Sequence, residues 1–208
     1  GETFIAFFML NLFNQEPINL NLPDAEFIYY PNFFLKEKAD IFFETLLKET
    51  PWQHDEITIF GKKILQPRLT SLYGNEGKSY GYSNIVMHPH AFNNTLTFIK
   101  DEIENTINEH FTTVLLNLYR NEKDSNGWHA DNEKELGRDP VIASLSLGEE
   151  RVFQIKHNTN KEVKRSIILQ HGSLLVMKNG AQIHYKHQIP KASKSKKPRI
   201  NLTFRNIT

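Results

Sequence analysis

The sequence predicts an α+β fold, with two amphipathic helices and a hairpin in the first half and a series of short strands in the second. Apolar residues recur at helical spacing in two early segments. Later the chain holds short runs rich in Val, Ile, Leu and Phe, separated by glycine, asparagine, proline or charged turns. Because no internal repeat or long linker interrupts its 208 residues, we expect a single domain, 1–208.

The first helix is expected in the segment LKEKADIFFETLLKE. Leu35, Ala39, Phe42 and Leu46 recur on one helical face there, and Pro51 stops the run.

A second amphipathic helix is expected within 90–111. Its apolar face is formed by Leu96, Ile99, Ile103 and Ile107. Between the two helices, β-rich pieces surround Gly61 in the segment ITIFGKKILQPRLTSLYGNEG. This pattern predicts a β-hairpin.

The second half of the chain contains six runs that predict strands. They cover 113–119, 141–147, 151–157, 163–170, 173–178 and 199–204. Short strands with turn residues between them indicate an antiparallel double sheet or barrel.

Composition narrows the possible chemistry. The chain has no cysteine, which excludes thiolate zinc sites, iron–sulfur clusters, disulfides and cysteine nucleophiles. Any metal must therefore bind imidazole and carboxylate groups. The absence of cysteine also fits a reducing compartment, and we expect a cytoplasmic protein, or a nuclear one if the source is eukaryotic.

The net charge of +1 gives no general case for a nucleic-acid partner, but the basic residues are unevenly distributed. The stretch KASKSKKPR gathers Lys191, Lys194, Lys196, Lys197 and Arg199. Such a run either contacts phosphates or forms a solvated loop, and the sequence leaves both interpretations open.

The amino-terminal stretch GETFIAFFML is apolar but too short to span a bilayer. It also lacks the basic start and small-residue cleavage site of a secretory signal. We expect no membrane association, and Met9 is a candidate alternative start. We treat about 1–30 as an amino-terminal extension.

A metal site is suggested by His129 and Asp131, two residues apart in WHAD. On an extended segment such residues point to the same face, so both can bind one ion. A distant imidazole would complete the two-histidine, one-carboxylate triad that binds Fe(II) and leaves open positions. Four later histidines are candidates for the third ligand: His157, His171, His184 and His187. Because His184 and His187 are three residues apart, they would face opposite ways on a strand.

The last strand carries two arginines, Arg199 and Arg205, in RINLTFR. On a regular strand they share one face with Asn201 and Thr203. Inward-facing arginines are costly unless anions meet them, and a dicarboxylate such as 2-oxoglutarate suits two guanidinium groups. The alternative is that both arginines pair with internal Asp or Glu residues.

Taken together, HAD, a late histidine and PRINLTFR resemble the motifs of the AlkB family of oxidative nucleic-acid dealkylases. The family also has an NxY motif shortly before HxD, which Asn117-Leu118-Tyr119 supplies here. The similarity covers about Ile57 to Phe204 and is strongest to the duplex-DNA repair branch. It implies a double-stranded β-helix (jelly-roll) core over about 112–208, with a nucleotide-recognition hairpin lid over about 52–90.

The resemblance also implies the ligands and the reaction. His187 becomes the distal metal ligand, so that His129, Asp131 and His187 hold Fe(II). The residues implied for 2-oxoglutarate are Asn117, Tyr119, Arg199, Asn201, Thr203 and Arg205. Within this set, Arg199 and Tyr119 would hold the distal carboxylate, and Arg205 would lie near the carboxylate at the metal. No catalytic residue beyond the metal centre is expected. The N-alkyl group of a base is hydroxylated and leaves as an aldehyde, with succinate and CO2 as the other products.

Substrate residues are implied by further segments. Tyr80 and Tyr82 match the base pocket, where Tyr82 would stack on a flipped base. Phe60, in the sequence Ile-Phe-Gly, matches a hairpin tip that wedges into the base stack. Arg68 matches a basic residue near DNA, and Glu133 matches one member of an acidic pair that reads the exocyclic amine. The chain departs from that pair at Asn132.

The expected function is repair of 1-methyladenine- and 3-methylcytosine-type lesions by a monomeric enzyme. Its expected partner is alkylated DNA, duplex or single-stranded, with RNA as the nearest alternative. A 2-oxoglutarate-dependent hydroxylase of proteins or small molecules would use the same triad but leaves the tyrosine pair, the Phe60 hairpin and the basic run unexplained. A non-catalytic jelly-roll binding protein would need neither the triad nor the two arginines.

Overall fold

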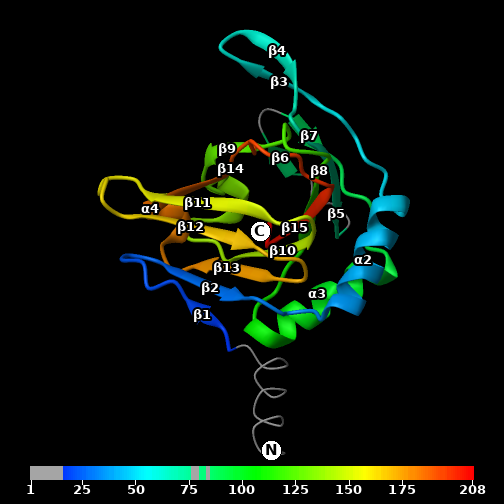
Figure 1. Cartoon of the computed structure of the whole chain (residues 1–208), viewed down its shortest axis with the longest axis horizontal. Coiled ribbons are helices and arrows are strands. Elements are labelled where there is room, and N and C mark those ends of the chain that lie inside the picture. The colour runs from blue at the N-terminus through cyan, green and yellow to red at the C-terminus, as the bar shows by residue number, and fades with distance from the viewer. Residues whose placement is uncertain (1–15, 76–79, 83–84) are drawn as a thin grey trace, which may run out of the picture.

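Two antiparallel sheets pack face to face in the computed structural model, which describes residues 16–75, 80–82 and 85–208 (Figure 1). In this part of the chain the larger sheet has the strand order β1 (Ile18–Asn19), β2 (Glu26–Tyr30), β13 (Leu174–Lys178), β10 (Ile142–Gly148), β15 (Arg199–Arg205), β8 (Thr113–Tyr119) and β5 (Leu69–Gly74). The smaller sheet has the order β12 (Lys164–Leu169), β11 (Arg151–His157), β14 (Tyr185–Ile189) and β9 (Asn126–His129).

Helices α2 (Lys36–Glu49) and α3 (Asn94–Ile107) pack on one face of the larger sheet. The apolar faces expected from the sequence pack against strand residues, although Ile107 is only half-buried and Leu35 is exposed. Leu35 precedes α2 and is 47% exposed, because the helix begins one residue later. Asn93 caps α3, accepting a hydrogen bond from the Leu96 backbone N–H at 2.8 Å. The smaller sheet packs against the opposite face of the larger sheet.

Between the sheets lies a second cluster of buried side chains, drawn from both layers. It includes Tyr119 and Ile142 from the larger sheet and Phe153, Ile155 and Tyr185 from the smaller one. This arrangement agrees with the expected antiparallel double sheet. All six strands predicted in the second half are present, with bounds within one residue of those expected.

A separate two-stranded hairpin projects from the sandwich at the top of Figure 1. It consists of β3 (Glu56–Ile59) and β4 (Lys62–Leu65), with Ile59 opposite Lys62. Phe60 and Gly61 form its two-residue turn, with φ of 48° and 76°. Positive φ at both positions is typical of the tight turns whose twist matches that of paired strands. The hairpin expected around Gly61 is therefore present.

Several elements were not predicted from the sequence. They include β9, β14, the short helix α4 (Ala181–His184) and the 3-10 turn η1 (Lys134–Leu136). Another small pair joins β6 (Tyr80–Tyr82) to β7 (Ile85–Met87). Within the segment treated as an extension, β2 pairs with β13 and so forms part of the larger sheet. No helix in the described ranges is long and apolar enough to cross a membrane.

Candidate active site

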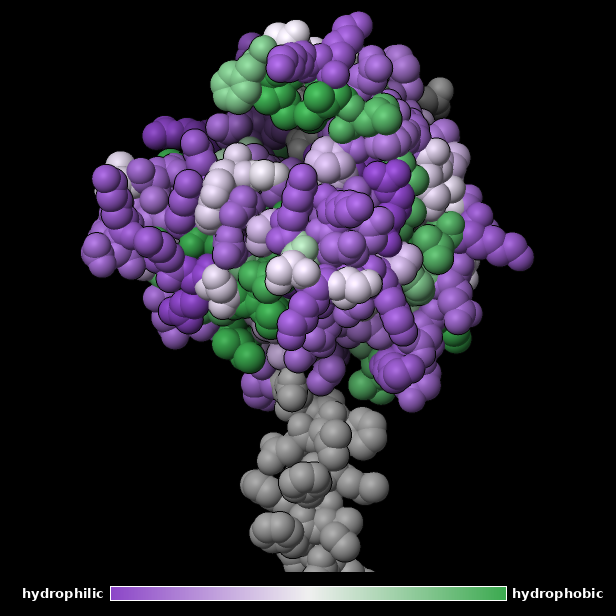
Figure 2. All heavy atoms as spheres, turned by 45° about the horizontal axis from the view of Figure 1, so that its top comes forward, coloured by the Kyte–Doolittle hydropathy of each residue, from purple (hydrophilic) through white to green (hydrophobic). Residues whose placement is uncertain are grey.

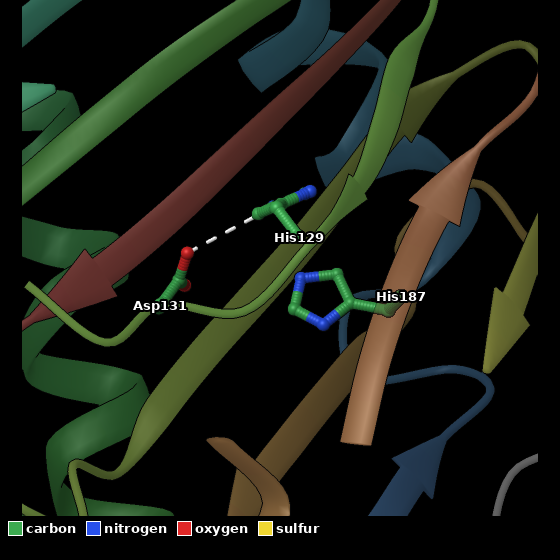
Figure 3. A group of neighbouring side chains, drawn as sticks. All are labelled: His129, Asp131 and His187. Carbon is green, nitrogen blue, oxygen red and sulfur yellow. Dashed lines mark ion pairs between the residues drawn. The ribbon is translucent and has the colours of Figure 1, made fainter. Parts of the chain in front are cut away.

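The smaller sheet brings His129, Asp131 and His187 together. His129 ends β9 and lies directly opposite His187 on β14, while Asp131 follows β9 by two residues. The potential ligand atoms of the three side chains all lie within 4.8 Å of one another. Figure 3 shows both imidazoles and the carboxylate converging from these two segments. Neutral imidazole and carboxylate in this number match the two-histidine, one-carboxylate metal site.

The electrostatic environment sets the protonation of this group. Burial alone would raise the pKa of Asp131, but the charges of Arg205, His129 and His187 outweigh it and lower the pKa to about 2. Burial and the neighbouring His129 lower the pKa of His187 to about 3. At neutral pH Asp131 is therefore a carboxylate and His187 a neutral imidazole, which are the forms that bind metals.

Hydrogen bonds from outside the group orient two of its members. His129 Nδ1 donates to the Gly127 carbonyl at 2.7 Å, which directs Nε2 to within 3.8 Å of Asp131 Oδ1. The Asp131 backbone N–H donates to Gln182 Oε1 at 2.8 Å. Gln182 is buried on α4, and its Nε2 lies 3.7 Å from Met177 Sδ. It thus connects the loop of Asp131 to the segment that leads into His187.

The other candidate histidines have different neighbours. His184 stacks on His157 with ring centroids 6.0 Å apart, and His157 Nε2 lies 3.1 Å from Asp24 Oδ2. His171 accepts from the Gly148 N–H and lies 2.8 Å from Asp40 Oδ1. None of these three belongs to the metal-binding group found in the described residues.

The two arginines of β15 have separate environments. Arg205 forms a buried salt bridge with Asp131, with Nη2 at 3.0 Å and Nε at 3.3 Å from Oδ2. Arg199 donates from Nη2 to Ser146 Oγ at 2.9 Å, and its guanidinium lies 5.1 Å from the centre of the Tyr119 ring. Its Nε and Nη1 are buried and have no hydrogen-bond partner among the described residues. Pairing with an internal acid thus accounts for Arg205, whereas Arg199 retains two donors.

Burial lowers the pKa of Arg199 to about 10, so its guanidinium is still charged at neutral pH. A buried cation with unsatisfied donors is costly and is stabilised by an anion that fits it. Arg199 therefore provides a site for a carboxylate inside the protein.

One cavity between the two sheets contains both the metal-binding group and Arg199. All six residues expected for the co-substrate line it: Asn117, Tyr119, Arg199, Asn201, Thr203 and Arg205. Its polar floor is ordered by hydrogen bonds, since Thr203 donates to Asn201 and Asn201 donates to Ser144 Oγ at 2.7 Å. A cavity that contains the metal-binding group at one point and the buried Arg199 at another fits a dicarboxylate that reaches between them.

Four of the five expected substrate residues fall into three situations. Phe60 is fully exposed at the hairpin tip. Glu133 is half-buried, and its Oε2 is buried without a hydrogen-bond partner among the described residues. The side chains of Tyr80 and Tyr82 lie outside the part of the chain that the structure describes.

Arg68, expected near nucleic acid, is buried in this structure. It is 4% exposed, and it donates from Nε to Asn117 Oδ1 at 3.0 Å and from Nη1 to the Ser125 carbonyl at 3.1 Å. Its contacts support the wall of the cavity from behind instead of facing solvent.

Two features of the site were missed in the sequence. Ser144 and Ser146 alternate with apolar residues on β10, and this spacing was a usable signal for polar groups facing a cavity. Gln182 carried no such signal, because it lies on α4, and a helix of four residues is too short to show a periodic pattern in the sequence.

Comparison with known proteins agrees with this geometry. Residues 26–205 match the family model of the 2OG-Fe(II) oxygenase superfamily. The chain is 41% identical to the alpha-ketoglutarate-dependent dioxygenase alkB homolog 3 of Bos taurus, over 85% of this chain and 64% of that protein. It is 35% identical to the human DNA oxidative demethylase ALKBH2, over 86% of this chain and 72% of that protein.

The chain spans less than two thirds of the alkB homolog 3 proteins, for example 65% of the human one, to which it is 40% identical. Among solved structures, that of OsALKBH1 matches with a TM-score of 0.67 at 14% identity, covering 92% of this chain and all of the other. This likeness concerns the fold. The superfamily implies Fe(II) as cofactor and 2-oxoglutarate as co-substrate, and the His–Asp–His group and Arg199 fit them. The chain belongs to the AlkB family of the 2OG-Fe(II) oxygenases.

Proposed function

We propose that this chain is an Fe(II)- and 2-oxoglutarate-dependent dioxygenase that demethylates N-alkylated bases of the 1-methyladenine and 3-methylcytosine type in DNA. The observation that carries the proposal is the single cavity in which the His–Asp–His group lies beside a buried arginine with two unsatisfied donors. Similarity to a DNA oxidative demethylase, human ALKBH2, supports the choice of substrate.

In this proposal His129, Asp131 and His187 would hold Fe(II), which would bind the co-substrate and oxygen. Bound iron supplies the activation of O2, coupled to decarboxylation of 2-oxoglutarate to succinate and CO2. Arg205 holds the carboxylate of Asp131 in place from the opposite sheet. Because Arg205 lies against the metal group, it also borders the end of the co-substrate nearest the metal.

Arg199 is proposed to bind the distal carboxylate of 2-oxoglutarate. A two-point contact with the carboxylate would combine its unpartnered Nε or Nη1 with the second N–H of Nη2, while the first N–H of Nη2 remains on Ser146. Tyr119 packs beside the guanidinium, and Asn117, Asn201 and Thr203 complete the polar lining. The chain's task is therefore to fix the distance between Arg199 and the metal group.

Gln182 is proposed as a positioning residue for Asp131. Replacing it by alanine removes the acceptor of the Asp131 N–H, and we expect the affinity for Fe(II) to fall about 10- to 100-fold, as for other residues that orient metal ligands. Co(II) titration of the purified variant measures this without turnover. Gln188→Ala on β14 is the matched control, because the Gln188 side chain donates to Gln154 on the outer face and forms no other hydrogen bond with the residues that the structure describes. Equal affinities in all three proteins would refute the assignment.

For the substrate, we propose that the region 52–90 acts as a lid over the catalytic core 112–208. Phe60 at the tip of its hairpin would insert into the base stack, and Tyr80 and Tyr82 would line the pocket for the flipped base. Figure 2 shows hydrophobic side chains gathered over this hairpin; they include Ile59, Phe60, Ile64 and Leu65, each at least 42% exposed. Such a patch on a projecting hairpin is typical of a contact surface.

Two further groups are proposed to contact nucleic acid. Glu133 has an unsatisfied buried oxygen that could accept from the exocyclic amine of a base.

The basic run is anchored at its backbone, where the Lys196 N–H lies 3.3 Å from Glu122 Oε2 and the Lys197 N–H 3.1 Å from Glu149 Oε2. These bonds hold the loop while leaving its exposed lysines directed to solvent, where phosphates can be bound.

Phe60→Ala is expected to lower kcat/KM on a methylated duplex about tenfold or more, since an inserted side chain offsets the few kcal/mol needed to unstack a base step. On single-stranded DNA the change should be under about twofold, because little stacking must be broken there. Thr58→Ala, at an exposed polar position on β3 of the same hairpin and outside the hydrophobic patch, is the matched control. Equal losses on both substrates would refute the wedge.

The proposed function is tested by turnover of three oligonucleotides carrying one 1-methyladenine: single-stranded DNA, duplex DNA and RNA. The purified protein is supplied with Fe(II), 2-oxoglutarate and ascorbate, and both repaired base and succinate are measured. We expect repair of DNA with one succinate per base. Repair of RNA alone would identify an RNA demethylase, and no repair of any substrate would overturn the proposal.

A further inference from the structure

The outer face of the smaller sheet carries a row of lysines that runs across three strands. Lys156 on β11 lies directly opposite Lys164 on β12 and Lys186 on β14. Lys164 and Lys186 are exposed and Lys156 is half-buried, whereas the neighbours of Lys156 and Lys186 toward the cavity, Ile155 and His187, are buried. The three lysines therefore share the face that points away from the active site.

No acidic side chain compensates this row. Like charges directly opposite each other destabilise a sheet, yet none of the three lysines forms a salt bridge with any residue that the structure describes. The adjoining row is neutral: Gln154 lies opposite Gln188 and Ser166, and Gln188 Nε2 donates to Gln154 Oε1 at 2.7 Å. The face thus presents positive charge and amide groups together.

A tryptophan joins the row to the active site. Lys156 Nζ lies 4.2 Å from the centre of the Trp128 ring, which is 38% exposed. Trp128 directly precedes His129 on β9, the edge strand of the sheet, so the two side chains point to opposite faces. Trp128, Lys156 and Lys164 also line a surface groove. A strand of nucleic acid that leaves the cavity beside β9 would therefore meet Trp128 first and the lysines next.

We propose that the face formed by Trp128, Lys156, Lys164 and Lys186, here called the lysine–tryptophan face, binds single-stranded nucleic acid that flanks the reacting base. This inference rests on the proposed function for the position of that base. Lysines supply phosphate contacts, and an aromatic ring supplies a stacking surface for any base. Three neighbouring strands cover roughly 10 Å. Long lysine side chains spread over that width can contact neighbouring phosphates of one strand.

The test compares the triple variant Lys156→Ala/Lys164→Ala/Lys186→Ala with the wild type in fluorescence anisotropy. The probes are unmodified single-stranded DNA of 20 and of 5 nucleotides, titrated over a range of salt concentrations. Loss of three phosphate contacts should reduce the slope of log K against log salt for the 20-mer by about 2, and weaken its binding about tenfold or more at low salt. Binding of the 5-mer should change less than about twofold, since it extends little beyond the cavity.

The triple variant Lys36→Ala/Lys38→Ala/Lys48→Ala on α2 is the control, because it removes the same charge from another surface. Equal losses in both variants would show a general charge effect and overturn the inference, as would no loss in the first. Displacement of the 20-mer by polyglutamate of equal charge would overturn it in favour of an acidic protein partner. If the wild type repairs no methylated oligonucleotide but the 20-mer result holds, the proposed function fails while the face stands.

Discussion

Replacing His187 by alanine is expected to abolish turnover and to weaken metal binding by more than the roughly 100-fold that loss of an orienting residue alone can cause. His187 is buried, lies directly opposite His129, and is neutral at neutral pH because burial and His129 lower its pKa to about 3. Apart from His129 and His187, no histidine in the described residues belongs to the metal-binding group with Asp131. Co(II) titration, followed by absorbance, measures the loss of a ligand directly, and succinate release measures turnover.

His184→Ala is the matched control, since His184 is three residues away and packs on His157 at the far end of α4. Both measurements should stay within about twofold of the wild type, because no metal ligand contacts it in the structure. A thermal melt without metal separates loss of the ligand from loss of packing against Phe153, whose ring lies 5.2 Å from that of His187. The reverse result, with His184 essential and His187 dispensable, would contradict the ligand assignment.

The metal site shows how far the sequence could predict. The spacing of His129 and Asp131 predicted that both face one way, and the structure agrees. The third histidine was selected only through resemblance, because β14 has no apolar run: its outward residues are Lys186 and Gln188. A strand next to the sheet edge with one polar face, such as β14, shows only a weak strand pattern in its sequence. Its partner β11 is also some 30 residues away in the sequence.

The arginines show a second limit. Period-2 spacing placed Arg199 and Arg205 on one face, and both line the cavity. Which of them meets an internal acid depends on the loop of Asp131, which comes from the other sheet and cannot be placed by local pattern. The burial of Arg68 could not be predicted for a related reason. Arginines are mostly exposed, so nothing in the sequence indicated that this one is buried against Asn117.

Arg199→Ala is expected to raise the Kd and KM for 2-oxoglutarate about 100-fold, since each hydrogen bond between charged groups contributes about 1.5–3 kcal/mol. Two donors of Arg199 have no partner among the described residues and can serve this purpose. The other arginine that lines the cavity, Arg205, is already paired with Asp131. Arg199→Lys retains the charge but not the two-point contact, so its Kd should lie between those of the wild type and the alanine variant. Calorimetric titration of 2-oxoglutarate into the metal-loaded protein measures the change.

Measuring metal affinity shows whether Arg199→Ala weakens 2-oxoglutarate binding directly or by disturbing the fold. Arg199 donates to Ser146, whereas Arg205 forms a salt bridge with Asp131. Arg199→Ala should therefore leave Co(II) binding within about twofold, while Arg205→Ala should weaken it. Arg138→Ala, at an exposed position, should change neither quantity. If Arg199→Ala lowered metal and 2-oxoglutarate binding equally, its role would be structural. If Arg199→Ala changed neither metal binding nor 2-oxoglutarate binding, the distal carboxylate would bind elsewhere. The proposed role of Arg199 would then be wrong.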